Sequence, residues 1–302
     1  MRRYSMVTFD VFSPRAFGGN QLAIFPEADE LSTDDMQTLA KEINLSETVF
    51  CFPPHSEKNT AKLRIFTPGK ELPVAGHPTI GTAVYFAELH GIQEGESIEF
   101  IFEEGVGPIH VDVNRQHGKL IARMHQPIPH RTNLTPIGEE AALLGLDAGQ
   151  LHPSIPPTGL SAGVPFLYIP LLDREALASI QFRRDVWESR YAKFEETSHI
   201  FAFAMDEKEP TRIHSRMFAP AMGISEDPAT GIASGPLGVF VAENFFAETA
   251  SSVHLVSIQG ADLGRRSVIQ IDLKREGGTW TDVSIAGTAV QVGEGAFFWE
   301  KK

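Results

Sequence analysis

Residues 64–68 read Arg-Ile-Phe-Thr-Pro and residues 216–220 read Arg-Met-Phe-Ala-Pro, so one short pattern occurs twice, at an offset of 152 residues. Two further blocks align in the same order at nearly the same offset: residues 49–52 with 200–203, and residues 76–83 with 226–233. The period is half of the chain, whereas a solenoid needs shorter units and at least three of them. The sequence therefore predicts a tandem duplication of one unit of ~150 residues.

Each copy is predicted to contain short alternating strands followed by a buried helix. In the first copy the helix lies between Pro78 and Gly91, because proline suits the first helical position and glycine often ends a helix. Its residues are apolar nearly all round, and so are residues 237–242, which follow Asp227-Pro228 in the second copy. Such a helix needs a sheet around it. We therefore predict an α+β fold with two pseudo-symmetric domains, each a curved sheet or barrel around a central helix.

Three other segments complete the predicted organisation. An amphipathic helix opens at the capping residue Ser32, ends near Asn44 and packs outside the first sheet. The Pro-rich stretch 126–130 links the two halves, and the alternating tail 282–299 forms a final hairpin. The predicted domains are 1–126, to which a strand at about 296–302 returns, and 127–295.

Composition restricts the classes of function and partner. Apolar residues are 42% and charged residues 22% of the 302, which is ordinary globular usage. The net charge of −13 repels phosphate backbones and the basic residues form only isolated pairs, so we expect no nucleic-acid partner. The single cysteine, Cys51, leaves no internal disulfide and no cysteine-based metal site, and the 11 histidines show no ligand spacing. No metal site is predicted.

The hydropathy pattern predicts a cytoplasmic protein with no membrane partner. No segment approaches the 18 apolar residues that span a bilayer. The first residues alternate as a strand and are interrupted by Asp10, which is not typical of a signal peptide.

The starts of the two buried helices are candidate binding positions for a small anion. Helix N-termini carry unpaired N–H groups and partial positive charge, and Gly76 and Gly231 let a ligand approach the backbone. His77 and Asp227 are equivalent under the repeat, which indicates a polar pair facing each other across an interdomain cleft. In the alternative interpretation, Asp227 only caps a helix and His77 is a capping or packed residue.

Glu47 is the candidate general acid/base. It stands at the point where the chain leaves the amphipathic helix for a strand, on the strand face opposite Phe50. A glutamate in a closed apolar cleft can exchange protons with carbon. The alternative is an exposed glutamate at a strand start.

The motifs in this chain, taken together and in order, resemble the PhzF family of phenazine biosynthesis isomerases. They are Phe17-Gly-Gly-Asn20, Asn44-Leu-Ser-Glu-Thr48, Arg64-Ile-Phe-Thr-Pro68, Glu71-Leu-Pro73, Gly76-His-Pro78, Ser215-Arg-Met-Phe-Ala-Pro220, Glu226-Asp-Pro-Ala-Thr-Gly231, Ile258-Gln-Gly260 and Gly264-Arg265. The resemblance runs nearly end to end. It implies a diaminopimelate epimerase fold, a homodimer, and isomerisation of a small carboxylate without a cofactor.

The resemblance also implies roles for individual residues. In the phenazine enzyme, trans-2,3-dihydro-3-hydroxyanthranilate is converted to its ketone tautomer, and the glutamate that moves the proton between ring carbons matches Glu47. The family residues that orient the substrate and assist the proton match His77 and Asp227. The matching motifs contribute the candidate substrate-binding residues, namely Asn20, Ser46, Gly76, Gly231 and Ile232.

Two departures from related patterns bear on the substrate. Epimerases of this fold use two cysteines at the helix starts, and this chain has only Cys51 elsewhere, so a two-thiol mechanism is excluded. The phenazine enzymes usually carry serine where this chain has Ile232, and loss of that hydrogen bond would cost roughly 1–3 kcal/mol. An epimerase that uses carboxylate bases, and a non-catalytic small-molecule-binding protein of the same fold, remain alternatives.

Overall fold

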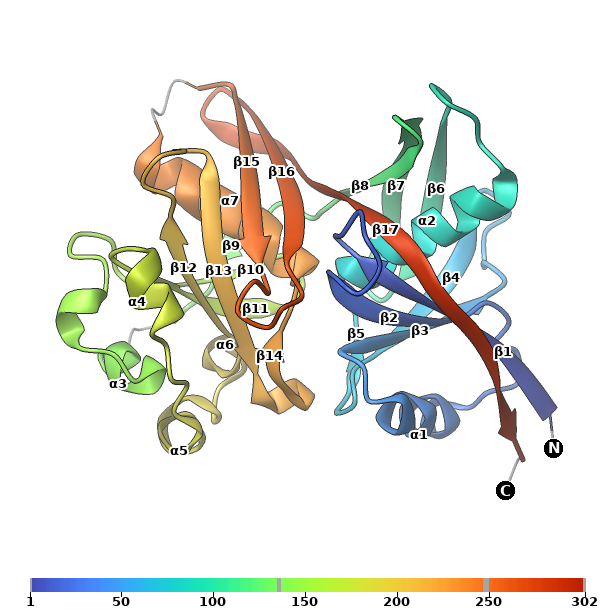
Figure 1. The fold of residues 1–302 in the computed structure, drawn as a ribbon, viewed down its shortest axis with the longest axis horizontal. Coiled ribbons are helices and arrows are strands. Elements are labelled where there is room, and N and C mark those ends of the chain that lie inside the picture. The colour runs from blue at the N-terminus through green and yellow to red at the C-terminus, as the bar shows by residue number, and fades with distance from the viewer. Residues whose placement is uncertain (1, 135–136, 247–249, 301–302) are drawn as a thin grey trace. The chain divides into compact units, whose positions relative to one another are not determined.

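The computed structural model describes residues 2–134, 137–246 and 250–300, and it divides into two compact units. Unit 1 contains Met1–His125 and Ala286–Lys302, and unit 2 contains Gln126–Ile285. Figure 1 labels the elements of each unit along the chain.

Unit 1 is a mixed sheet. Its strands are β1 (Arg2–Val11), β2 (Asn20–Phe25), β3 (Glu47–Phe52), β4 (Ala61–Phe66), β5 (Glu71–Leu72), β6 (Ser97–Glu104), β7 (Gly107–Gln116), β8 (Lys119–His125) and most of β17 (Thr279–Trp299). Strand β2 pairs parallel with β3, β3 antiparallel with β4, and β4 parallel with β6. Strands β6, β7 and β8 follow as antiparallel neighbours.

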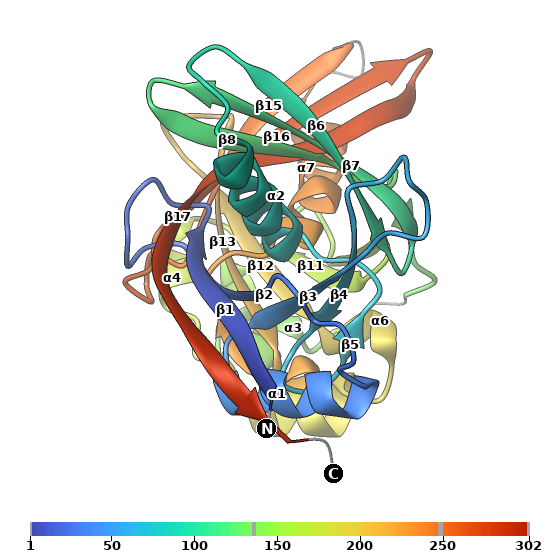
Figure 2. The ribbon, with the colours of Figure 1, turned by 90° about the vertical axis from the view of Figure 1, so that its right-hand side faces the viewer.

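The helix α2 (His77–His90) lies inside this sheet. It contacts β1, β2, β3, β6, β7 and β8, and Figure 2 shows it among those strands. It begins after Gly76 and ends at Gly91, whose φ of 62° is easily adopted by glycine. The predicted buried central helix is therefore confirmed in unit 1. Among the described residues, no helix combines the length and apolar character needed to cross a bilayer.

The helix α1 (Thr33–Ile43) packs on the other side of these strands. Ser32 and Asp35 form a reciprocal capping box, and Asn44 ends the helix with a φ of 54°. Its apolar side chains, Met36 and Leu39 among them, belong to one buried cluster with Phe25 and Phe50. The amphipathic helix predicted between Ser32 and Asn44 is confirmed.

Unit 2 repeats the order of strand pairings. Its strands are β9 (His130–Arg131), β10 (Thr158–Ser161), β11 (Pro165–Pro170), β12 (Ile200–Met205), β13 (Arg212–Ala219), β14 (Ile224–Asp227), β15 (Ser252–Gln259) and β16 (Ser267–Glu276). Strand β11 pairs parallel with β12, β12 antiparallel with β13, β13 parallel with β15, and β15 antiparallel with β16. The helix α7 (Gly231–Phe245) contacts β10, β15 and β16 and is buried over most of its length.

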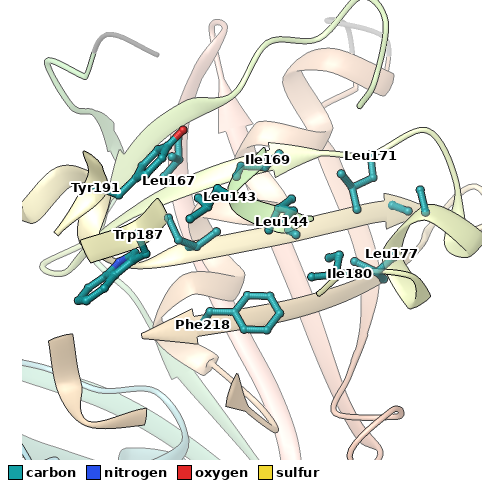
Figure 3. Close-up of a cluster of buried hydrophobic side chains, with 14 residues drawn as sticks. Leu143, Leu144, Leu167, Ile169, Leu171, Leu177, Ile180, Trp187, Tyr191 and Phe218 are labelled. Atoms are coloured by element: carbon teal, nitrogen blue, oxygen red, sulfur yellow. The ribbon is translucent and has the colours of Figure 1, made fainter. Parts of the chain in front are cut away.

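Short helices cover one side of the unit 2 sheet. They are α3 (Glu140–Leu144), α4 (Arg174–Ala178), α5 (Arg184–Val186), α6 (Glu195–Ser198) and the single turns 148–150 and 187–191, while another turn, 220–222, connects β13 to β14. Figure 3 shows their side chains, such as Leu143, Leu177 and Trp187, packed with strand residues including Leu167 and Phe218. This apolar cluster anchors the helices to the sheet.

Two predicted details are wrong. The tail is one continuous strand, β17, and not a hairpin, because it pairs antiparallel with β1 from Arg2 opposite Trp299 to Val11 opposite Ala289. Strands β1 and β17 run side by side in Figure 1. The alternative in which Asp227 caps the second buried helix is also wrong, since Asp227 is the last residue of β14 and Thr230 is the residue that precedes α7.

Candidate active site

Three side chains predicted to act in the site meet in unit 1. The Nδ1 atom of His77 lies 2.8 Å from Oε2 of Glu47 and 3.2 Å from Nδ2 of Asn20. The exposed fractions are 1% for His77, 1% for Asn20 and 9% for Glu47. We call this buried polar cluster the Glu47–His77 pair with Asn20.

The sheet and the central helix bring these residues together. Asn20 and Glu47 are the first residues of β2 and β3, which run parallel, so their side chains lie at one edge of the sheet. His77 is the first residue of α2, which is packed against both strands. The cluster therefore forms where two parallel strands and a buried helix all begin.

The contacts at His77 Nδ1 imply that one proton lies between the histidine and the glutamate. Either the Nδ1–H group donates to the Glu47 carboxylate, or a protonated Glu47 donates to Nδ1. Both forms keep a hydrogen bond at 2.8 Å. A buried pair of this kind can hold a proton on either partner, as a general acid/base requires.

A second polar cluster surrounds Asp227 in unit 2. The Thr230 hydroxyl donates to Oδ2 of Asp227 at 2.7 Å, and Gln259 Nε2 donates to the Asp227 carbonyl at 2.8 Å. Gln259 Oε1 also accepts from the Thr230 backbone N–H at 3.0 Å. Asp227 is 4% and Gln259 1% exposed. The side chain of Gln259 thus bridges the loop that leads from β14 into α7.

Replacing Gln259 by alanine is expected to destabilise unit 2. The change leaves the Thr230 N–H and the Asp227 carbonyl buried without these partners, which costs about 1–3 kcal/mol for such groups. Urea unfolding of wild type and Gln259→Ala measures the loss, with the exposed Gln116→Ala as the matched control. Equal midpoints for all three proteins would show that Gln259 does not hold this loop.

The remaining predicted residues lie beside these clusters. Ser46 is half-buried and directly precedes Glu47, and Gly76 is the residue before α2. In unit 2 the Gly231 carbonyl accepts a hydrogen bond from Gln126 Nε2 at 3.1 Å, and Ile232 is buried in the first turn of α7. Each therefore lies at or next to the start of β3, α2 or α7.

Cys51 is a buried apolar residue and does not supply a nucleophile. It is 2% exposed on β3, and burial raises the pKa of its thiol to about 12. Because the reactive form is the thiolate, such a group stays inert near neutral pH. Among the residues that the structure describes, no group of three or more His, Cys, Asp or Glu side chains is placed to hold a metal ion.

Sequence reasoning assigned no role to Glu104 or Gln259. Glu104 is the last residue of β6 and is 8% exposed, and its Oε1 lies 2.6 Å from the Thr79 hydroxyl. The strand period offers a signal that could have found it, since Phe100, Phe102 and Glu104 alternate on one face and all three are buried. Gln259 stands in the motif Ile258-Gln-Gly260, but the motif does not reveal its role, because that role depends on a loop that precedes it by about thirty residues.

Comparison with known sequences gives a consistent result over the whole chain. Residues 9–295 match the family described as phenazine biosynthesis-like protein. An uncharacterized isomerase of Mesorhizobium japonicum is 33% identical, over 99% of this chain and 100% of that protein. The trans-2,3-dihydro-3-hydroxyanthranilate isomerase of Pseudomonas chlororaphis is 32% identical, over 96% of this chain and 97% of that protein.

Solved structures share the fold. A Bacillus anthracis phenazine biosynthesis protein of the PhzF family superposes with a TM-score of 0.87 at 24% identity, covering 99% of this chain and 100% of that one. A hydroxyproline epimerase of Agrobacterium vitis superposes with a TM-score of 0.67 at 10% identity, covering 98% of this chain and 92% of that one. These likenesses confirm the predicted α+β, epimerase-like fold.

Proposed function

The chain belongs to the phenazine biosynthesis-like protein family and is an isomerase, and from this premise we propose its reaction. We propose that it moves a proton between carbon atoms of a small, carboxylate-bearing unsaturated or cyclic substrate, without a cofactor. Glu47 is the proposed general acid/base.

The observation that carries the proposal is the buried Glu47–His77 pair. A carboxyl group that removes a proton from carbon must keep that proton away from water until it is returned. Glu47 is 9% exposed, and its Oε2 has a hydrogen-bond partner 2.8 Å away that can take or release a proton. The burial of Glu47 and its contact with His77 therefore support the proposal that the pair transfers a proton.

The proposed reaction needs no change in oxidation state. Glu47 removes a proton from an sp³ carbon of the substrate, and the electron pair of that C–H bond forms a new double bond. The existing double bond shifts, and the same carboxyl group delivers the proton to the carbon at its far end. His77 orients Glu47 and shares the proton between the two steps.

We further propose that Asp227 contacts the substrate and that Gly76 and Gly231 let it approach the backbone. Two helix starts, at α2 and α7, supply N–H groups suited to a carboxylate. Ile232 offers an apolar surface where the phenazine enzymes usually carry serine. We therefore propose a substrate that lacks the polar group which that serine would bind.

Incubation in D2O tests this function directly. The purified protein is mixed with trans-2,3-dihydro-3-hydroxyanthranilate and with a panel of unsaturated and cyclic carboxylates, and carbon-bound deuterium is followed by NMR. Deuterium uptake with a double-bond shift supports the isomerase. Exchange at a stereocentre without such a shift would instead indicate an epimerase, and binding without any exchange would indicate a non-catalytic binding protein.

The assembly and location are further proposals that follow from the family. We propose a homodimer in the cytoplasm, and sedimentation velocity on the purified protein tests the dimer. A single species at the monomer mass of 33.2 kDa would contradict it.

A further inference from the structure

Glu104 is a buried carboxyl group that the proposed mechanism does not use. It ends β6 behind the first turn of α2, and its Oε1 lies 2.6 Å from the hydroxyl of Thr79. Its Oε2 is buried, and no described residue forms a hydrogen bond with it. An ionised carboxylate would leave this oxygen charged and unsolvated, which is costly in a protein interior.

The number of hydrogen atoms at the Thr79 hydroxyl indicates which protonation state of Glu104 is compatible with its two short contacts. The Thr79 hydroxyl lies 2.7 Å from the Ala75 carbonyl as well as 2.6 Å from Glu104 Oε1. It has one hydrogen, and a carbonyl can only accept. Both short contacts therefore contain a hydrogen only if Thr79 donates to Ala75 while a protonated Glu104 donates to Thr79.

We propose that Glu104 carries its proton in the active protein and acts as a positioning residue for the Glu47–His77 pair. In this arrangement Glu104 donates to the Thr79 hydroxyl, and Thr79 donates to the Ala75 carbonyl. These two hydrogen bonds hold the turn that contains Gly76 and His77. This inference rests on the proposed function only for the part played by the pair; the protonation of Glu104 stands independently of it.

The surroundings of Glu104 favour the neutral form. Burial, as the largest cause, raises the pKa of Glu104 to about 8. Hydrogen bonds that the Thr79 hydroxyl and the Ala75 backbone N–H could donate to an ionised Glu104 oppose this rise, and the negative charge of Glu47 adds to it. Ionisation of Glu104 would place a second buried negative charge near Glu47 and raise the cost of charging either.

The other charged groups near Glu104 either pair with one another or form no hydrogen bond or ion pair with Glu104. Glu104 lines a cavity of about 550 Å³. The charged residues that line it as well come from β4, β5, β6 and the loop before β4, and they are Lys62, Arg64, Glu71, Glu103 and His55. The Arg64 guanidinium is bound to Glu71 at 2.6 Å. Glu103 accepts from the backbone of His55 at 2.9 Å. Within the described ranges, no cation pairs with Glu104.

The proposal predicts what happens when Glu104 ionises. The Thr79 hydroxyl must then turn its hydrogen toward the carboxylate, because that bond becomes charge-assisted. The Ala75 carbonyl loses its donor, and the turn before His77 loosens. The distance between His77 and Glu47 is then no longer held, so turnover falls as the pH rises past the pKa of Glu104.

A carboxyl NMR titration of the full chain tests the protonation without any substrate. Glutamate is labelled with ¹³C at Cδ, and Glu104→Gln identifies the Glu104 signal by its disappearance. We expect that signal to keep the shift of a protonated carboxyl up to pH 7 and to move near pH 8. A Glu104 signal that titrates below pH 6 would overturn the proposal.

Four variants test the positioning role through the rate of deuterium exchange. We expect Glu104→Ala to lower kcat at least tenfold, and Glu104→Gln to restore most of it, because the amide N–H can donate to Thr79 in place of the acid. Glu104→Gln should also abolish the loss of rate between pH 7 and 9. Thr79→Val should resemble Glu104→Ala, whereas Thr79→Ser, which keeps the hydroxyl, is the matched control.

The outcomes separate this inference from the proposed function. If Glu104→Gln is as slow as Glu104→Ala, or if the pH profile keeps its alkaline fall, Glu104 is not a positioning residue. If the wild type exchanges no deuterium with any carboxylate while Glu104 titrates near pH 8, the proposed function fails and the protonated carboxyl stands.

Discussion

Glu47→Gln is expected to slow proton transfer by on the order of 10²–10⁴-fold. Glutamine keeps the size of the side chain and can still form a hydrogen bond with His77 Nδ1, but its amide cannot take a proton from carbon. The loss should therefore fall on kcat, with a small change in KM, because the substrate still binds. The rate of deuterium incorporation from D2O measures it.

The same assay contains its control. Glu42→Gln changes an exposed glutamate on α1 and should leave the rate unchanged. If the two residues work as one unit, the double variant Glu47→Gln with His77→Asn should be about as slow as Glu47→Gln alone. A Glu47→Gln rate equal to that of wild type would remove Glu47 from the mechanism.

The second large effect is a loss of stability with rising pH that comes from Glu104. Its pKa is about 8 in the folded protein and 4.5 as an ordinary glutamate, so the folded state holds the proton more tightly than the unfolded chain does. The stabilisation is complete below pH 4.5 and is lost as the pH rises through 8. The slope between these limits is about 1.4 kcal/mol per pH unit.

Comparison with Glu104→Gln isolates this contribution. Groups such as Asp206 and His214, whose pKa values are lowered, contribute equally to both proteins and cancel in the difference. Between pH 5 and 8, the free energy of unfolding of wild type should fall by about 3–4 kcal/mol relative to Glu104→Gln. Urea unfolding at each pH measures the difference. A difference that stays constant over this range would mean that Glu104 ionises at its ordinary pKa.

Periodic patterns in the sequence predicted much of the fold. The apolar stretch after Pro78 predicted a buried helix, and α2 lies inside the sheet of unit 1 as expected. The Ser32–Asn44 pattern predicted α1, because capping and amphipathicity depend on residues within a few positions of one another. The prediction of a hairpin for the tail is wrong because its partner strand, β1, lies at the opposite end of the chain. The alternation of apolar and polar residues indicates a strand but does not identify the strand with which it pairs.

The candidate site was likewise predicted only in part from the sequence. Motifs of the sequence indicated Asn20, Glu47 and His77, and the structure brings these three together in one buried cluster. It places Asp227 at the end of β14, three residues before its hydroxyl donor Thr230. The loop-bridging role of Gln259 follows only from the pairing of strands distant in sequence.

By itself, the amino-acid sequence determined the repeated pattern and the buried helices and indicated the residues of the proposed proton shuttle, because all of these are local patterns or matched motifs. Only the tertiary structure decided which of those side chains meet and which carboxyl group lies away from water. Glu104 and Thr79 are separated by 25 residues along the chain, and their contact at 2.6 Å exists because β6 packs against the start of α2. The protonation of a carboxyl group depends on the solvation and hydrogen bonds that such packing creates, and these are absent from any linear pattern.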